Sequence, residues 1–187
     1  MKILKSNFIK MVAALTAVGI FSGAALVFVY NYAMPKIKVN VIKETESAIK
    51  KIFPATESIK KTKDDGVYKV TDQSGKEIGY AFLAEGNGYQ GTIKLIVGAD
   101  AVLTTLNGME VLESQETPGL GAEIASSTFK DQFSGLSITH PIEYVKNQKP
   151  DEPYQIEAIT GATISSRAVV NALNDKIDEM RKVFEGK

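Results

Sequence analysis

The stretch Glu157-Ala-Ile-Thr-Gly-Ala-Thr-Ile-Ser-Ser166 stands directly before a long amphipathic pattern that runs to Phe184. Apolar residues recur there at helical intervals, which predicts a helix with its N-terminus near Thr163. The first N–H groups of a helix lack intrahelical partners and lie at the positive end of the helix dipole, so hydroxyls and a glycine placed there suit a phosphate group. An ordinary turn and helix cap would use the same residue types, and the rest of the chain must separate the two interpretations.

The composition limits the chemistry that the chain can perform. Its 187 residues carry 22 basic and 22 acidic side chains, so the net charge is zero and a nucleic-acid partner is not indicated. Cysteine is absent, which excludes iron–sulfur clusters, thiolate zinc sites and cysteine nucleophiles. The single histidine, His140, is too little for a histidine-rich metal site or a Ser-His-Asp triad. Any redox chemistry therefore has to come from a bound organic cofactor.

Residues 1–35 are typical of a short cytoplasmic tip followed by a transmembrane anchor in contact with lipid. Residues 11–30 form an uncharged, mostly apolar run, and a membrane helix needs about 20 such residues. A cleaved signal peptide ending near Ser22-Gly23-Ala24 is the alternative, but the run exceeds the roughly 7–15 residues of a signal core. Pro35 is expected to end the helix. Lysines flank the run on both sides, and because long domains translocate regardless of nearby charge, the early lysines favour an extracytoplasmic soluble domain.

The remaining residues divide into a connecting helix, 36–54, and a domain, 55–187. The helical pattern of the first segment favours a solvated spacer with one apolar stripe, closed by Pro54. Four strands in meander order are expected at residues 66–71, 78–84, 89–97 and 101–114, the last interrupted at Asn107-Gly108. An edge strand at 142–145 and helices before and after the meander complete an α+β class built on an antiparallel sheet. G-x-G-x-x-G occurs at residues 86–91, but it lies between two expected strands and does not open a helix, and G-x-x-x-x-G-K does not occur, so nicotinamide and P-loop sites lack support.

A second candidate motif, Glu116-Thr-Pro-Gly-Leu-Gly121, follows the expected meander. Pro118-Gly119 fits the centre of a type II turn, and Gly121 could lead into a helix through Phe133. Turn chemistry does not require the polar pair Glu116-Thr117. A polar pair beside a glycine-rich turn is typical of the edge of a cofactor pocket.

These two motifs, in this order behind one N-terminal span, resemble the FMN-binding domain family. The resemblance is strongest to the G subunit of the Rnf electron transport complex, a membrane-bound ferredoxin:NAD oxidoreductase, and extends to the C subunit of the sodium-pumping NADH:quinone oxidoreductase. It covers nearly the whole chain, from the anchor to the last helix.

The resemblance implies covalent FMN, joined through its phosphate to Thr163 by a flavin transferase of the ApbE type. The family pattern is D-x-x-(S/T)-G-A-T, and this chain has Glu157 at the acidic position, which keeps the carboxylate and the spacing. Ser165 and Ser166 could hold the phosphate or only continue the cap. The other implied cofactor contacts are Thr160, Gly161 and Ala162 beside the phosphate and Glu116, Thr117, Leu120 and Gly121 at the edge of the isoalloxazine.

The implied role is an electron relay between redox subunits of an ion-translocating complex, so the chain would be a subunit and not a complete enzyme. Residues 11–29 contain no ionisable side chain, so ion movement is expected from other subunits. Two alternatives stay open. One is a free-standing, membrane-anchored extracytoplasmic flavoprotein electron carrier, and the other is a tethered binding or scaffold domain without cofactor.

Overall fold

A computed structural model describes residues 2–185 of the chain, with side chains described from Phe8 to Phe184. The chain forms two compact units, one extending to Lys43 and one beginning at Glu44. The second unit contains the sheet, the shorter helices and the candidate site.

The first unit belongs to a single long helix, α1 (Lys2–Ile52), which continues through Pro35. The expectation that Pro35 ends the helix was wrong. A proline removes one backbone donor, and membrane helices tolerate this loss. Within the described residues, the segment Phe8–Ile52 is the one helix long and apolar enough to cross a membrane; its most apolar window has a mean hydropathy of 2.3.

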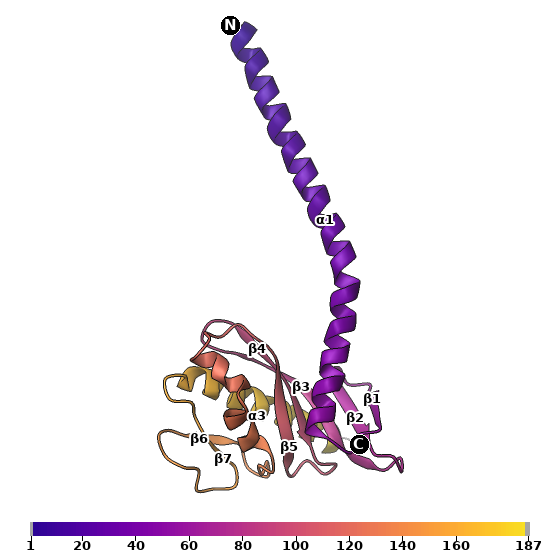
Figure 1. Cartoon of the computed structure of the whole chain (residues 1–187), viewed down its shortest axis with the longest axis vertical. Helices are drawn as coiled ribbons and strands as arrows, with labels where there is room; N and C mark the ends of the chain where they lie inside the picture. Colours follow the sequence, from indigo (N-terminus) through magenta and orange to yellow (C-terminus); the bar gives the residue numbers. More distant parts are fainter. Residues whose placement is uncertain (1, 186–187) are drawn as a thin grey trace. The chain divides into compact units, whose positions relative to one another are not determined.

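An antiparallel sheet with strand order β1-β2-β3-β4-β5 forms the centre of the second unit (Figure 1). This arrangement confirms the predicted α+β class with strands in meander order. The strands are β1 (Ser58–Lys61), β2 (Val67–Thr71), β3 (Glu77–Asn87), β4 (Thr92–Ala99) and β5 (Leu106–Ser114).

The sheet departs from the expected strands at both ends. β1 was not predicted, because Ser-Ile-Lys-Lys carries only one large apolar residue. Residues 101–105 are a turn and not a strand, since the carboxylate of Asp100 accepts hydrogen bonds from the backbone N–H groups of Thr104 (2.7 Å) and Thr105 (3.2 Å). The interruption expected at Asn107-Gly108 appears as a register shift where β5 pairs with Gly98 and Ala99.

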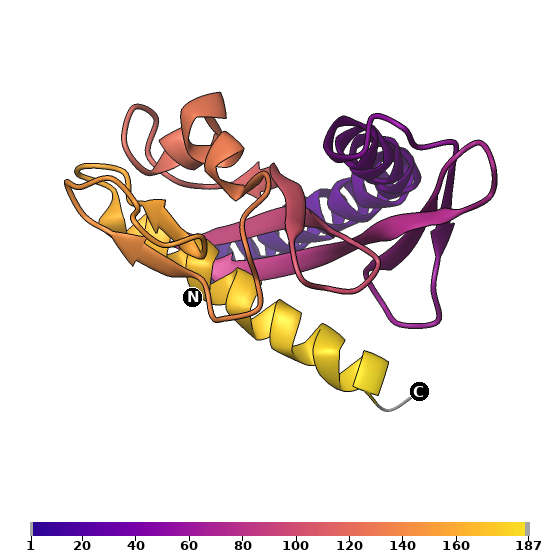
Figure 2. The ribbon, with the colours of Figure 1, turned by 90° about the horizontal axis from the view of Figure 1, so that it is seen from below.

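Both faces of the sheet are covered, which explains the continuous apolar runs of β3 and β4. In β3, Ala81 joins the hydrophobic cluster on one face and Phe82 joins the cluster on the other. The end of α1 covers the first face through Ile49 and Ile52, and the last helix, α3 (Thr163–Glu185), covers the second (Figure 2). The end of the apolar stripe of the expected spacer, at Ala48, Ile49 and Ile52, is therefore buried against the sheet and not solvated, whereas Val41 and Ile42 are exposed.

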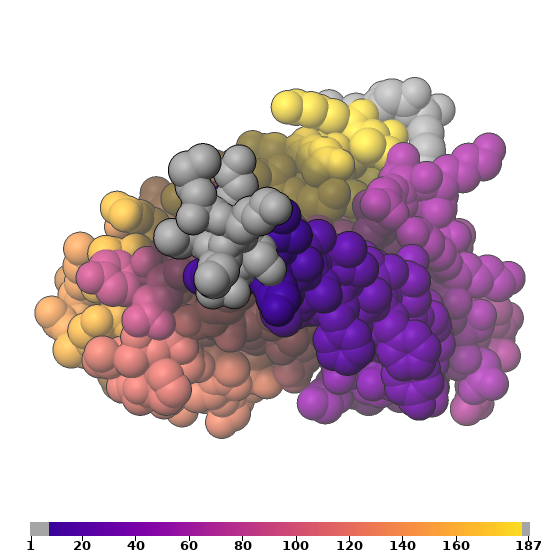
Figure 3. All heavy atoms as spheres, turned by 90° about the horizontal axis from the view of Figure 1, so that it is seen from above, coloured from indigo at the N-terminus to yellow at the C-terminus, as the bar shows by residue number. Residues whose placement is uncertain are grey.

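Short elements join the sheet to α3. The helix expected from Gly121 to Phe133 is present as three pieces, η1 (Gly121–Ala125), α2 (Ser127–Lys130) and η2 (Asp131–Phe133). The predicted strand near residue 142 is β6 (Glu143–Val145), which pairs in parallel with β7 (Gln155–Glu157) in a separate small sheet. In the space-filling view, β1 and β2 lie at one end of this unit and residues 121–160 lie at the other (Figure 3).

Candidate functional site

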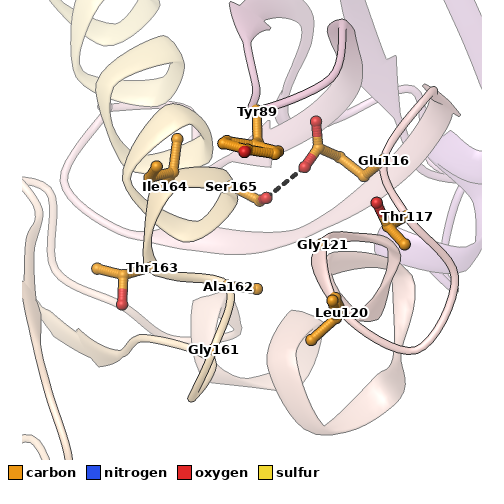
Figure 4. A pocket seen from close by; sticks show the side chains of 10 residues that line it. All are labelled: Tyr89, Glu116, Thr117, Leu120, Gly121, Gly161, Ala162, Thr163, Ile164 and Ser165. Atoms are coloured by element: carbon orange, nitrogen blue, oxygen red, sulfur yellow. Dashed lines mark hydrogen bonds between the residues drawn. The ribbon is translucent and has the colours of Figure 1, made fainter.

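A pocket of about 420 Å³ lies where the N-terminus of α3 meets the turn after β3 and the loop after β5 (Figure 4). The structure thus brings together parts of both sequence motifs, although 35 residues lie between the motifs along the chain. The residues that line the pocket are Tyr89, Glu116, Thr117, Leu120, Gly121, Gly161, Ala162, Thr163, Ile164 and Ser165.

Thr163 is the first residue of α3 and is half-buried at the wall of this pocket. The N–H of Ser166 donates to the carbonyl of Ala162 at 3.0 Å, which is the first hydrogen bond of the helix. The N–H groups of residues 163–165 precede that bond and have no carbonyl four residues earlier within the helix. A hydroxyl beside free N–H groups at the positive end of a 23-residue helix favours an anionic ligand group.

The Ser166 side chain fixes the loop that precedes α3. Its hydroxyl is fully buried, accepts a hydrogen bond from Ile159 N–H at 3.0 Å and donates one to the carbonyl of Ala162 at 3.1 Å. Gly161 adopts φ +82°, a backbone conformation that a side chain would strain. Ser166 is therefore occupied inside the protein and holds the shape of the loop that presents Thr163.

Glu116 and Ser165 form a buried pair in the wall of the pocket. The Ser165 hydroxyl donates to one carboxylate oxygen of Glu116, and the N–H of Gln90 donates to the other at 2.8 Å. Only 6% of Glu116 is exposed. Its burial acts to raise the pKa, but hydrogen bonds from Ser165 and from the N–H groups of residues 89–91 outweigh that effect, so the pKa lies below its ordinary value. The carboxylate is therefore ionised at neutral pH and joins three segments of the wall.

The lowered pKa of Glu116 makes the stability of this unit depend on pH. A carboxylate with a lower pKa in the folded state stabilises that state above its unfolded pKa, near the ordinary value of 4.5, and the stabilisation is lost as the pH falls through the folded pKa. We expect wild type to unfold at a higher temperature than Glu116→Gln at pH 7, and the difference to shrink below about pH 4. Thermal melts of both proteins in detergent across this range test the prediction, and a constant difference would contradict it.

Two glycines leave the space that Glu116 occupies. A Cβ placed on Gly121 would collide with the Glu116 carboxylate and lie 2.6 Å from the Ser165 hydroxyl oxygen. A Cβ on Gly88 would collide with the other carboxylate oxygen and lie 2.8 Å from Ile93 Cδ1. Glycine at residue 121 is thus required by the packing of the carboxylate.

Glu157 and Thr160 do not line this pocket. They lie in a second pocket of about 370 Å³, together with Glu123, Ser126, Thr128, Phe129, Gln132, Ala158 and Ile159. The Gln132 side chain fixes Glu157 through both backbone groups, accepting from its N–H at 2.6 Å and donating to its carbonyl at 3.2 Å. The Thr160 hydroxyl donates to Asn147 Oδ1 at 3.3 Å. The two residues therefore line a different pocket from Thr163.

The sequence analysis missed two of the three large exposed residues that line the first pocket. Tyr89 is 71% exposed, Leu120 49% and Ile164 44%. Only Leu120 was predicted at the site. Tyr89 follows the glycine-rich turn after β3 and was placed at the start of a strand, and Ile164 falls within the helical pattern. Nothing in the local sequence of either residue indicates a pocket.

Comparisons with known proteins agree with this geometry. The FMN-binding domain family matches residues 88–178, which include both motifs. The G subunit of an ion-translocating oxidoreductase complex from Methanosarcina acetivorans is 32% identical over 179 residues, 90% of this chain and 92% of that protein. The G subunit of a Na(+)-translocating ferredoxin:NAD(+) oxidoreductase complex from Acetobacterium woodii is 38% identical, over 56% of this chain and 50% of that protein.

The fold has a counterpart among solved structures. The crystal structure of Shewanella oneidensis NqrC superposes with a TM-score of 0.55 at 24% identity, over 65% of each chain. This likeness shows the fold alone, and the sequence relatives show the family. The chain therefore belongs to the FMN-binding domain family, among the G subunits of ion-translocating oxidoreductase complexes, and its N-terminal helix anchors it to a membrane.

Proposed function

We propose that the chain is the membrane-anchored electron-transfer subunit of an Rnf-type complex and carries FMN joined through its phosphate to Thr163. The observation that carries the proposal is the convergence of the two motifs on one pocket at the N-terminus of α3. Electrons would enter from one redox subunit and leave to another, and the coupled ion would move through other subunits.

The pocket fits a flavin nucleotide. Its volume of about 420 Å³ lies within the roughly 300–1,000 Å³ typical of small-molecule sites. The start of α3 offers N–H groups to a phosphate, and Gly161 lets the backbone come close to it. Leu120 and Ile164 supply apolar surface at the mouth. The pocket therefore offers backbone N–H groups for the phosphate of FMN and apolar side chains for its ring.

The proposal gives the two walls of the pocket separate tasks. Thr163 would hold the phosphate by a covalent bond, with the N–H groups at the start of α3 beside it. Thr117, Leu120 and Gly121 would border the ring from the opposite wall. When bound, FMN supplies reversible one-electron chemistry, and the protein supplies its orientation and electrostatic environment.

Attachment requires a separate enzyme, for which we propose a flavin transferase of the ApbE type that uses FAD. The Thr163 oxygen forms a bond to the phosphorus of the FMN half, the pyrophosphate bond breaks, AMP leaves and the hydroxyl proton is released. Glu157 and Thr160 face the second pocket, so in this proposal they serve recognition by the transferase and do not contact bound FMN.

Purification of the full chain from solubilised membranes tests the proposed function. We expect a fluorescent band at its mass on a denaturing gel, a peptide containing Thr163 that carries FMN, and co-purifying redox subunits. Protease added to sealed cells lacking an outer wall should cut the domain, because we propose that it lies on the extracytoplasmic side with α1 in lipid. A protein without flavin, or one recovered without redox partners, would contradict the relay, and a protected domain would contradict the sidedness.

A further inference from the structure

We infer that Glu116 keeps the redox potential of the proposed flavin low by placing a fixed, uncompensated negative charge in the wall of the pocket. The inference rests on the proposed function and gives Glu116 an electrostatic role in addition to its structural one. Three observations carry it: the charge of the lining, the kind of partners that surround the carboxylate, and the space left for it.

The lining of the pocket has one formal charge. Of the ten described residues that line it, only Glu116 is ionised at neutral pH, and none is lysine or arginine. Reduction adds electrons to a flavin. A fixed negative charge near the flavin opposes that addition and lowers the midpoint potential.

The partners of Glu116 fix its charge without cancelling it. The carboxylate receives hydrogen bonds from the Ser165 hydroxyl and the Gln90 N–H, which are neutral donors. No ion pair among the described side chains involves Glu116, whereas the nearby exposed Glu113 is paired with Lys94 at 2.7 Å. The positive end of α3 offsets part of the charge, but a helix terminus amounts to about half a unit charge. A net negative charge therefore remains in the wall.

Two glycines leave room for the Glu116 carboxylate in the wall of the pocket. Gly88 and Gly121 each leave space that a Cβ would take from one of its two oxygens. If the side chain only joined these segments, a neutral hydrogen-bond acceptor would serve with a smaller free-energy penalty, because burial of an ionised group is unfavourable. The structure retains a carboxylate here, where its charge acts on the contents of the pocket.

The test is the midpoint potential of the flavin-loaded chain, measured by spectroelectrochemistry in detergent for Glu116→Gln and for the matched control Glu113→Gln. Glu113 is an exposed glutamate three residues away that does not line the pocket. We expect Glu116→Gln to raise the potential, so that the ratio of reduced to oxidised flavin at a fixed applied potential increases about tenfold. Glu113→Gln should leave the ratio unchanged, and Glu116→Asp should stay near wild type because it keeps the charge.

A structural role alone would produce a different pattern. Glu116→Gln would then lower the melting temperature and leave the potential of the folded, loaded protein at the wild-type value, which would overturn the inference. If Glu116→Gln does not fold, Thr117→Lys places a cation in the lining, and an unchanged potential in that variant overturns the inference equally. If wild type carries no flavin by mass, the proposed function fails and the inference with it; loaded variants with equal potentials refute the inference alone.

Discussion

Replacement of Thr163 by valine is expected to abolish covalent flavin. Valine keeps the branched shape of threonine and removes the hydroxyl that would bond to the phosphate, so fluorescence on a denaturing gel should disappear. The peptide that contains residue 163 should lose the mass added by FMN. Because Thr163 is half-buried at a helix start, the free energy of unfolding should change by no more than about 1 kcal/mol.

The matched variant for this experiment is Thr163→Ser, which restores a hydroxyl at the same backbone position. We expect it to retain covalent flavin, with slower loading because serine has more rotamer freedom than a β-branched residue. Fluorescence that persists in Thr163→Val would place the bond on another residue. Absence of fluorescence from wild type and both variants would refute covalent attachment altogether.

Gly121→Ala is expected to have the largest effect on stability at the site. The added Cβ would collide with the Glu116 carboxylate and its Cβ and crowd the Ser165 hydroxyl. The hydrogen bond between these two side chains would have to break or shift, which leaves a buried charge without one of its donors. We expect a loss of roughly 3 kcal/mol in the free energy of unfolding and a low yield of loaded protein.

The same turn contains a control for this substitution. Gly119 has φ +73°, and a Cβ built there meets nothing within 4 Å. Gly119→Ala should therefore cost only backbone strain, about 1 kcal/mol, and should load flavin nearly as well as wild type. Chemical denaturation and flavin fluorescence of Gly121→Ala and Gly119→Ala measure the two losses in stability and loading. Equal losses in the two variants would show that turn strain, and not the packing of Glu116, is what residue 121 controls.

Periodicity predicted the elements whose burial is regular. The last helix appears where its apolar spacing places it, because residues such as Val169, Leu173 and Ile177 all enter one core. The strands β2 to β4 are present near their predicted positions, although β3 continues to Asn87 through the turn expected at residues 85–88 and β4 begins at Thr92. The prediction that Pro35 ends the helix was wrong because the effect of a proline on a helix depends on its surroundings. β1 was not predicted because a four-residue strand of Ser, Ile and Lys has no alternating apolar pattern.

The site was only partly accessible from the sequence. The Thr160 to Thr163 motif predicts the start of a helix, and the turn at Pro118-Gly119 predicts a backbone that a ligand can approach closely. Neither motif predicts that the two segments lie side by side. That meeting depends on the path of the chain between residues 121 and 157. The hydrogen bond from Ser165 to Glu116 and the exposed ring of Tyr89 are tertiary features, and no local pattern of these residue types encodes them.

For the proposed attachment of flavin, the half-exposed position of Thr163 at the surface of the domain implies an order of maturation. The hydrophobic clusters on both faces of the sheet are made by the protein's own side chains, and the Ser166 hydroxyl holds the loop before α3. Modification can therefore follow folding and membrane insertion. Newly made chains would accumulate as a stable, colourless precursor, and the supply of transferase and FAD would determine how much of it becomes competent for electron transfer.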